Sequence, residues 1–135
     1  GSVAEDFETR RVTCDFYQLG ALIAFVLTMK SVNGELYSRL PPELHWRTYG
    51  GDYKDIEGVV RNQLDEVFSE VDSGTHPAIR KEAMAIIRDL CDPDPTTRGF
   101  KVVSGARTRS SAMSRVASRL DLLAKRAAVA RLVAP

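Results

Sequence analysis

Only a few polar side chains in this sequence stand at spacings that could do chemistry. Asp92 and Asp94 form a close pair of carboxyls, an arrangement that general acid–base catalysis uses when the two groups differ in protonation. The prolines that follow each of them favour another interpretation, in which both carboxyls hydrogen-bond the backbone of a turn. His45 and His76 are 31 residues apart in segments predicted to be loops, and nothing in the sequence points to a nucleophile beside either of them.

Motifs for phosphate, metal and redox chemistry are absent. The sequence contains no GxGxxG or GxxxxGK[ST] loop, no HExxH, no paired CxxC and no EF-hand spacing. We therefore predict no catalytic, cofactor-binding or metal-binding residue. Cys14 and Cys91 are interpreted as reduced, buried thiols of a cytosolic protein, with a disulfide between them as the less favoured alternative.

Apolar periodicity predicts an all-α fold of four or five helices without a strand. Asp15 should cap a helix that begins at Phe16, and this helix is apolar nearly all round. We therefore expect an enclosed central helix, with Leu22, Ile23 and Val26 in the core. Its longest apolar stretch is too short to span a bilayer, so no membrane partner is expected.

The rest of the chain divides at prolines and glycines. Residues 35–55 should be irregular, with His45, Trp46 and Tyr49 as an aromatic plug on the core and a ligand clamp as the less favoured alternative. Further helices are predicted over 53–71, from Pro77 to about Cys91, and from about Ser110 onward.

Charge is distributed unevenly along the chain. Residues 1–97 hold 10 basic and 17 acidic residues, whereas residues 98–135 hold 9 basic residues and one acidic residue. The basic tail either folds back onto the acidic body or binds an acidic partner. Nucleic acid is a further alternative, although no recognition-helix unit is evident. The candidate partner-binding residues are Arg107, Arg109, Arg115, Arg119, Lys125, Arg126 and Leu123.

The last helix has an apolar stripe that repeats every three or four residues. The first part of this stripe should pack on the body. Leu123 and the residues beyond it are expected to overhang, and an overhanging stripe favours a homodimer or a partner helix.

Two ordered motifs resemble the second half of a protein kinase C-terminal lobe. Asp15-x-Tyr17-x-Leu19-Gly20, followed by an apolar run, is similar to the start of the central kinase helix αF, with Gln18 in place of the usual serine and Met29 where the family often has glycine. Asp94-Pro95-x-x-Arg98 is similar to the segment that follows kinase helix αH. The resemblance covers roughly residues 12–100 and is closest to bacterial Ser/Thr kinases.

The resemblance implies structural roles for four residues. Asp15 corresponds to the aspartate that braces the catalytic loop, and Gly20 belongs to the same motif. Arg98 corresponds to the arginine that pairs with the glutamate of Ala-Pro-Glu, so it should be partly buried on a carboxylate or on carbonyls. Glu5 stands nearest to that glutamate, although Val3-Ala4-Glu5 lacks the proline.

The expected organisation is a remnant or linker over 1–11, a domain resembling the kinase C-lobe from αF to αI over 12–103, and a basic helix over 104–135 packed on it. The Gly-rich loop, strand lysine, catalytic loop and Asp-Phe-Gly of kinases are absent, so this chain alone should not be an enzyme. It would serve as a scaffold and docking module for the missing kinase portion, a substrate or a regulator in the cytoplasm. The alternative is a stand-alone interaction module that uses its basic tail.

Overall fold

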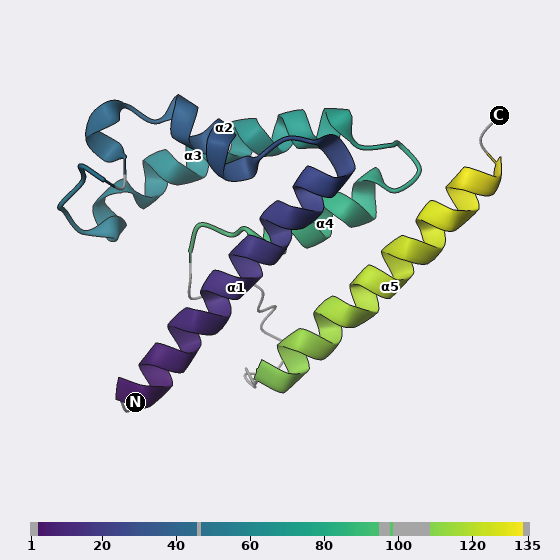
Figure 1. The fold of residues 1–135 in the computed structure, drawn as a ribbon, viewed down its shortest axis with the longest axis horizontal. Helices are drawn as coiled ribbons and strands as arrows, with labels where there is room; N and C mark the ends of the chain where they lie inside the picture. The colour runs from purple at the N-terminus through teal and green to yellow at the C-terminus, as the bar shows by residue number, and fades with distance from the viewer. Residues whose placement is uncertain (1–2, 46, 95–97, 99–108, 134–135) are drawn as a thin grey trace.

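The structure, a computed structural model, describes residues 3–45, 47–94, 98 and 109–133, and within these the side chains of 14–94, 98 and 114–131 except residue 46. The described part is helical, as predicted, with five α-helices and one short 3₁₀ segment (Figure 1). The elements are α1 (Val3–Thr28), α2 (Val32–Arg39), η1 (Pro42–Leu44), α3 (Tyr53–Gly74), α4 (Arg80–Leu90) and α5 (Arg109–Val133).

Helix α1 begins at Val3, so the prediction of a start at Phe16 was wrong. Asp15 lies in the interior of the helix and caps nothing, because helical residues continue on both sides of it. The residues before Asp15 contain no proline, and the only glycine among them is Gly1, so nothing in the sequence stops the helix from extending toward the N-terminus. Residues 3–11, expected in a linker, are therefore part of this helix.

Helix α2 covers the first part of residues 35–55, which were predicted to be irregular, so that prediction was wrong up to Arg39. The side chain of Ser31 accepts a hydrogen bond from the backbone N–H of Gly34 and so caps the helix. Glu35 and Arg39 then form an ion pair one turn apart, at 2.7 Å. The Asn-Gly pair thus lies in the first helical turn rather than in a loop.

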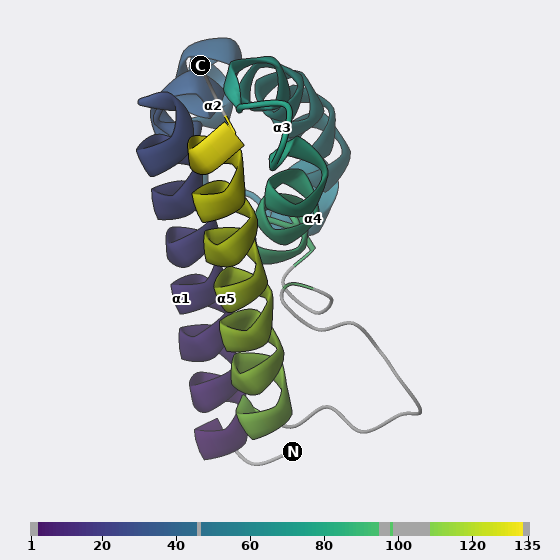
Figure 2. The ribbon, with the colours of Figure 1, turned by 90° about the vertical axis from the view of Figure 1, so that its right-hand side faces the viewer.

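Helix α1 lies against α4, α2 and α3, while α5 packs on α4 (Figures 1 and 2). It packs most extensively on α4, and α2 and α3 cover a neighbouring side. The first core cluster joins α1 to α2, α3 and α4 around Ala24, Val32, Leu64, Val67 and Ile87. The second joins α1 to α4 and α5 around Phe16, Ile86, Leu90, Val116 and Leu123.

Gly20 allows the close approach of α1 to α4. A Cβ at this position would lie 2.6 Å from the Sγ of Cys91 and 2.8 Å from the Cβ of Leu90. Atoms cannot remain at those distances, so only glycine fits between the two helices here.

The expectation that α1 is enclosed on all sides was wrong. Leu22 is 57% exposed and Val26 68% exposed, and only Ile23 of the three expected core residues is partly buried. Phe25 and Met29 are also exposed. These side chains are exposed because the neighbouring helices contact other sides of α1.

Helix α5 spans the predicted residues, packs on α4 and runs in roughly the same direction as α1 (Figures 1 and 2). Val116, Leu120, Leu123 and Ala127 face the second core cluster. Leu123 is buried, so the expectation that it overhangs was wrong. A charged residue at Leu123 would disrupt the packing of α5 rather than test a dimer.

Candidate functional site

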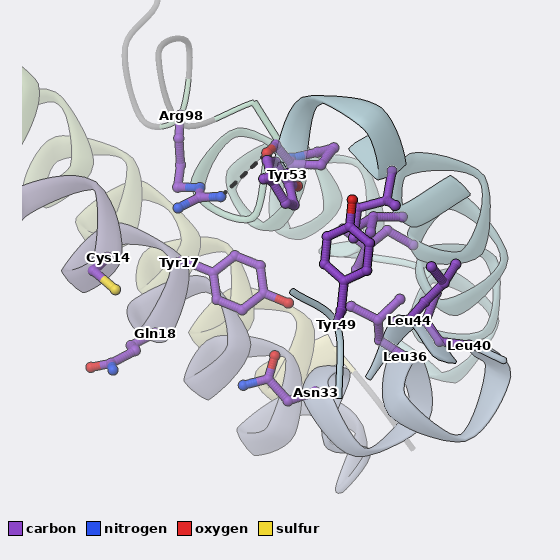
Figure 3. A pocket seen from close by; sticks show the side chains of 14 residues that line it. Cys14, Tyr17, Gln18, Asn33, Leu36, Leu40, Leu44, Tyr49, Tyr53 and Arg98 are labelled. Carbon is purple, nitrogen blue, oxygen red and sulfur yellow. Dashed lines mark hydrogen bonds between the residues drawn. The ribbon is translucent and has the colours of Figure 1, made fainter. Parts of the chain in front are cut away.

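A cavity of about 660 Å³ opens between α1, α2, η1, the start of α3 and the turn after α4. Most of its wall is apolar or aromatic, and Figure 3 shows the side chains around it. It is lined by Cys14, Tyr17, Gln18, Asn33, Leu36, Leu40, Leu44, Tyr49, Tyr53, Ile56, Val60, Leu64, Pro93 and Arg98.

Three tyrosines contribute hydroxyl groups to the wall of this cavity. The hydroxyl of Tyr49 donates to the backbone O of Asp52 at 2.7 Å, and that of Tyr53 donates to the backbone O of Pro93 at 2.8 Å. The ring of Tyr17 reaches toward the centre of the cavity (Figure 3). Burial raises the pKa of Tyr17 and of Tyr53, so both phenols keep their proton near neutral pH, and that of Tyr53 is already donated in its hydrogen bond to Pro93.

Arg98 closes one side of the cavity. Its Nε donates to the backbone O of Asp92 at 2.7 Å, and a terminal nitrogen lies 3.5 Å from the backbone O of Pro93 (Figure 3). Its guanidinium also lies over the ring of Tyr17, 5.1 Å from the centroid. The prediction that Arg98 is partly buried and engaged with carbonyls is confirmed.

The carboxyl of Asp92 has the role of a turn residue near Arg98. The backbone N–H of Asp94 donates to Oδ1 of Asp92 at 2.9 Å, which is the local bond expected after a helix exit. Oδ1 of Asp92 also lies 3.7 Å from a guanidinium nitrogen of Arg61. These contacts hold the turn that carries Arg98.

The two histidines support local structure as well. Nε2 of His45 is 2.9 Å from the backbone O of Leu40, and its ring lies 3.8 Å from that of Tyr37. Nδ1 of His76 accepts a hydrogen bond from the backbone N–H of Ala78. In the described part of the chain, no group of three or more His, Cys, Asp or Glu residues could hold a metal ion.

The cysteines differ from each other in exposure. Cys91 is buried as predicted, and burial raises the pKa of its thiol to about 12. Cys14 is exposed, which corrects the expectation that both thiols are buried. Both thiols are free in the structure.

A second surface runs along the exposed side of α1. It consists of Asp15, Gln18, Leu22, Phe25, Val26 and Met29, and we call it the bare face of α1. The first five positions lie on one side of a helix with 3.6 residues per turn, and Met29 directly follows the last residue of α1. Asp15 lies at the N-terminal end of the bare face, and no described residue is its hydrogen-bond or ion-pair partner.

The basic tail folds back onto the acidic body in part. Arg119 pairs with Asp89 of α4, and Arg126 pairs with Glu82 of α4 at 3.0 Å. Lys125 pairs within the helix with Asp121, at 2.8 Å. These ion pairs hold part of the basic tail against the acidic body, as the sequence interpretation in which the tail folds back predicted.

The remaining candidate residues from the sequence are Arg115, Arg107, Arg109 and Glu5. Arg115 is partly buried and has an interaction partner. Arg107 lies outside the described residues, as do the side chains of Arg109 and Glu5. The pairing of Arg98 with Glu5 therefore stays a prediction.

The sequence interpretation missed the cavity because it assigned no helix to residues 32–39. Leu36 and Leu40 stand one helical turn apart, and Glu35 and Arg39 show the same spacing. These two pairs, with Ser31 before them, are the signals that could have identified α2 and its apolar side.

Within the described residues, no single helix has both the length and the apolar composition of a membrane span. The segments Cys14–Thr28 and Val32–Arg39 reach these values only when joined, and they meet at a bend of 98°.

Comparisons with known proteins return no relative. No family model matches the chain, and neither the curated proteins nor the solved structures contain a significant match.

Proposed function

We propose that this chain is the later, helical part of a kinase-like lobe, catalytically incomplete alone, which serves as a scaffold and docking surface for the earlier part. The observation that carries the proposal is the bare face of α1. Four large apolar side chains on this face are 42–73% exposed, although the helix packs on α2, α3 and α4. Soluble proteins rarely leave such a continuous apolar surface without a partner.

The size of the apolar surface supports a specific contact. Full burial of a large apolar side chain contributes ~1.5–3 kcal/mol. Leu22, Phe25, Val26 and Met29 are about half exposed, so covering them would contribute on the order of 4 kcal/mol. In the lobe that the sequence resembles, the helix corresponding to α1 is central, and the earlier part of the kinase would cover this face.

Two positions, one in α1 and one directly after its last residue, support this interpretation. Asp15 is exposed on the bare face, where the resembling aspartate would brace the catalytic loop. Met29 has a φ of 61°, at the position where the family often has glycine. A left-handed residue directly after a helix is usually glycine, so the backbone here has the conformation that the family residue favours.

Arg98 and its cavity would be the second contact with the earlier part. The guanidinium is held over Tyr17 by backbone carbonyls, and the apolar wall beside it can take aliphatic side chains. By resemblance, the end of the activation segment would dock here.

The test uses the polypeptide encoded directly upstream of Val3, produced as a separate chain. We expect it to contain the kinase motifs that this chain lacks, and to bind this chain in calorimetry. Val26→Glu on the bare face should weaken binding by about tenfold or more. Val129→Glu on α5 is the matched control, since Val129 is 60% exposed and Val26 68% exposed, and it should leave binding unchanged.

Two results would count against this proposal, and the first of them would favour the stand-alone interaction module. A start codon near Val3 with no kinase motifs upstream would overturn the proposal. Binding that is insensitive to Val26→Glu would overturn the assigned surface.

A further inference from the structure

Helix α5 carries an outward stripe in addition to the one that packs on the body. Leu122, Lys125, Arg126, Val129 and Ala130 stand at i, i+3, i+4, i+7 and i+8, so they share one side of the helix. Leu122 is 48% exposed and Val129 60% exposed, although both are large and apolar. This spacing is the one through which a helix contacts another helix.

The stripe borders a hollow in the surface. A depression of about 540 Å³ is lined by the five stripe residues and by Ala78, which precedes α4. A smaller depression of about 210 Å³ adjoins it at Ala130 and reaches Ile79. Together they form a groove along the last turns of α5, which we call the α5 groove.

The charged side chains that line the two depressions are all basic, namely Lys125, Arg126 and Arg131. The acids Asp121 and Glu82 stand beside them as ion-pair partners. The described side chains of α5 include five basic residues and one acidic residue, Asp121. Lys125 and Arg126 stand between the apolar positions, and their side chains are 72% and 51% exposed. The pair of Lys125 with Asp121 is exposed on both sides, so it is worth little and can rearrange when a partner arrives. Arg126 pairs with Glu82, whose side chain is 24% exposed, so Lys125 is the cation that a partner engages more readily.

We propose that the α5 groove binds an acidic amphipathic helix of another protein. Leu122 and Val129 would receive the apolar side of the partner helix, and Lys125 and Arg126 would face carboxylates beside that side. From Leu122 to Ala130 the groove spans ~12 Å of helix axis, so two to three turns of the partner suffice. The proposal goes beyond the proposed function, since the groove lies on α5 and not on the bare face of α1.

The observations favour this occupant over two others. A second copy of α5 would bring Lys125 and Arg126 against like charges, which is unfavourable. Nucleic acid would use the cations but leave Leu122 and Val129 without an apolar contact, whereas a phosphate backbone is bound by positive charge. An acidic helix satisfies both kinds of side chain.

The test uses a fluorescein-labelled synthetic peptide of about 18 residues, long enough for measurable helix in water. It carries leucines at i, i+3, i+4 and i+7, with glutamates on both flanks. A second peptide has lysine in place of every glutamate. Fluorescence anisotropy with the full chain measures both affinities. We expect the acidic peptide to bind, the basic peptide to bind at least about tenfold more weakly, and salt to weaken the acidic peptide.

Two variants separate this site from the rest of the surface. Val129→Glu should weaken the acidic peptide about tenfold or more, because it places a like charge and removes an apolar contact. Val26→Glu is the matched control on α1, and it should leave the affinity unchanged. The far-UV circular dichroism of both variants should match that of the parent chain, since both valines are exposed.

Three results would overturn the inference. The first is equal affinity for the acidic and the basic peptide. The second is an affinity for the acidic peptide that Val129→Glu leaves unchanged. The third is displacement of the acidic peptide by a short DNA duplex that binds the parent chain and Val129→Glu equally well. The last result would assign the cations to nucleic acid. Because Val26→Glu tests the bare face separately, failure here leaves the proposed function untouched.

Discussion

Replacing Gly20 by alanine should destabilise the fold although alanine is the better helix former. The added Cβ would lie 2.6 Å from the Sγ of Cys91 and 2.8 Å from the Cβ of Leu90, and both atoms are buried. Overpacking a core costs ~1–3 kcal/mol, and two contacts this short place the cost at the upper end. Alanine regains ~1 kcal/mol of helix propensity, which leaves a net loss of ~2 kcal/mol.

Gly58 provides the matched control. It lies in the middle of α3, and a Cβ there would meet no atom within 4 Å. Gly58→Ala should therefore stabilise the chain by ~0.5–1 kcal/mol. Urea unfolding followed by circular dichroism measures both changes.

A double variant identifies the contact that causes the loss. Cys91→Ala removes the Sγ but leaves the Cβ of Leu90, so Gly20→Ala with Cys91→Ala should lose less stability than the two single losses added together. If Gly20→Ala is as stable as the parent while Gly58→Ala stabilises, α1 does not approach α4 as closely as described.

Four further predictions follow from the same structure. Leu22→Ala should change the free energy of unfolding by less than ~0.5 kcal/mol, whereas Leu64→Ala should cost ~2–5 kcal/mol, and equal losses in urea titrations would contradict the bare face. Met29→Gly should stabilise the chain by ~1 kcal/mol in the same assay, because Met29 has a φ of 61°, and a loss of stability would refute strain there. At pH 8, iodoacetamide should modify Cys14 and spare Cys91, whose pKa is raised to about 12. The thiol of Cys91 stays protonated in the folded chain, whereas the same thiol ionises above about pH 8.5 in the unfolded chain. Its contribution to the free energy of unfolding should therefore be full below that pH and decline above it. Rapid modification of Cys91 in the folded chain, or stability that does not decline at alkaline pH, would contradict its burial. Calorimetry should detect no binding of ATP·Mg to this chain alone, and micromolar affinity would overturn its assignment as catalytically incomplete.

The amphipathic helices could be predicted from the sequence because their patterns are simple. Helices α3, α4 and α5 each place one apolar stripe on the core, and prolines or polar caps mark where α3 and α4 end. Val67, Ile86 and Ile87 are buried as their spacing requires. One-sided periodicity is enough to assign such elements.

Helix α1 shows what periodicity cannot decide. A helix that is apolar all round offers no indication of which side its neighbours will cover, so Leu22 and Ala24 look equally suited to the core. The structure buries Ala24 and leaves Leu22 exposed. The difference arises from the packing of α2, α3, α4 and α5, which the pattern of α1 itself does not encode.

The cavity and the place of Leu123 depended on long-range packing. Tyr17, Leu40, Tyr53 and Arg98 come from four separate segments, and their meeting follows from how α2 folds over α1 and α3. Arg98 was identified only through its resemblance to a kinase residue. Leu123 was misplaced because the length of α5 does not show how far α4 extends beneath it.

Hydroxyl-radical oxidation of Met29 tests the central claim most directly. Met29 is 73% exposed at the end of the bare face, and Met84 is 7% exposed in the core, so the two serve as probe and internal reference. In this chain alone, Met29 should oxidise much faster than Met84. In a longer protein that includes the upstream kinase-like part, Met29 should be protected severalfold while Met84 is unchanged. Equal oxidation of Met29 in both proteins would contradict the claim that the bare face of α1 is a docking surface for that part.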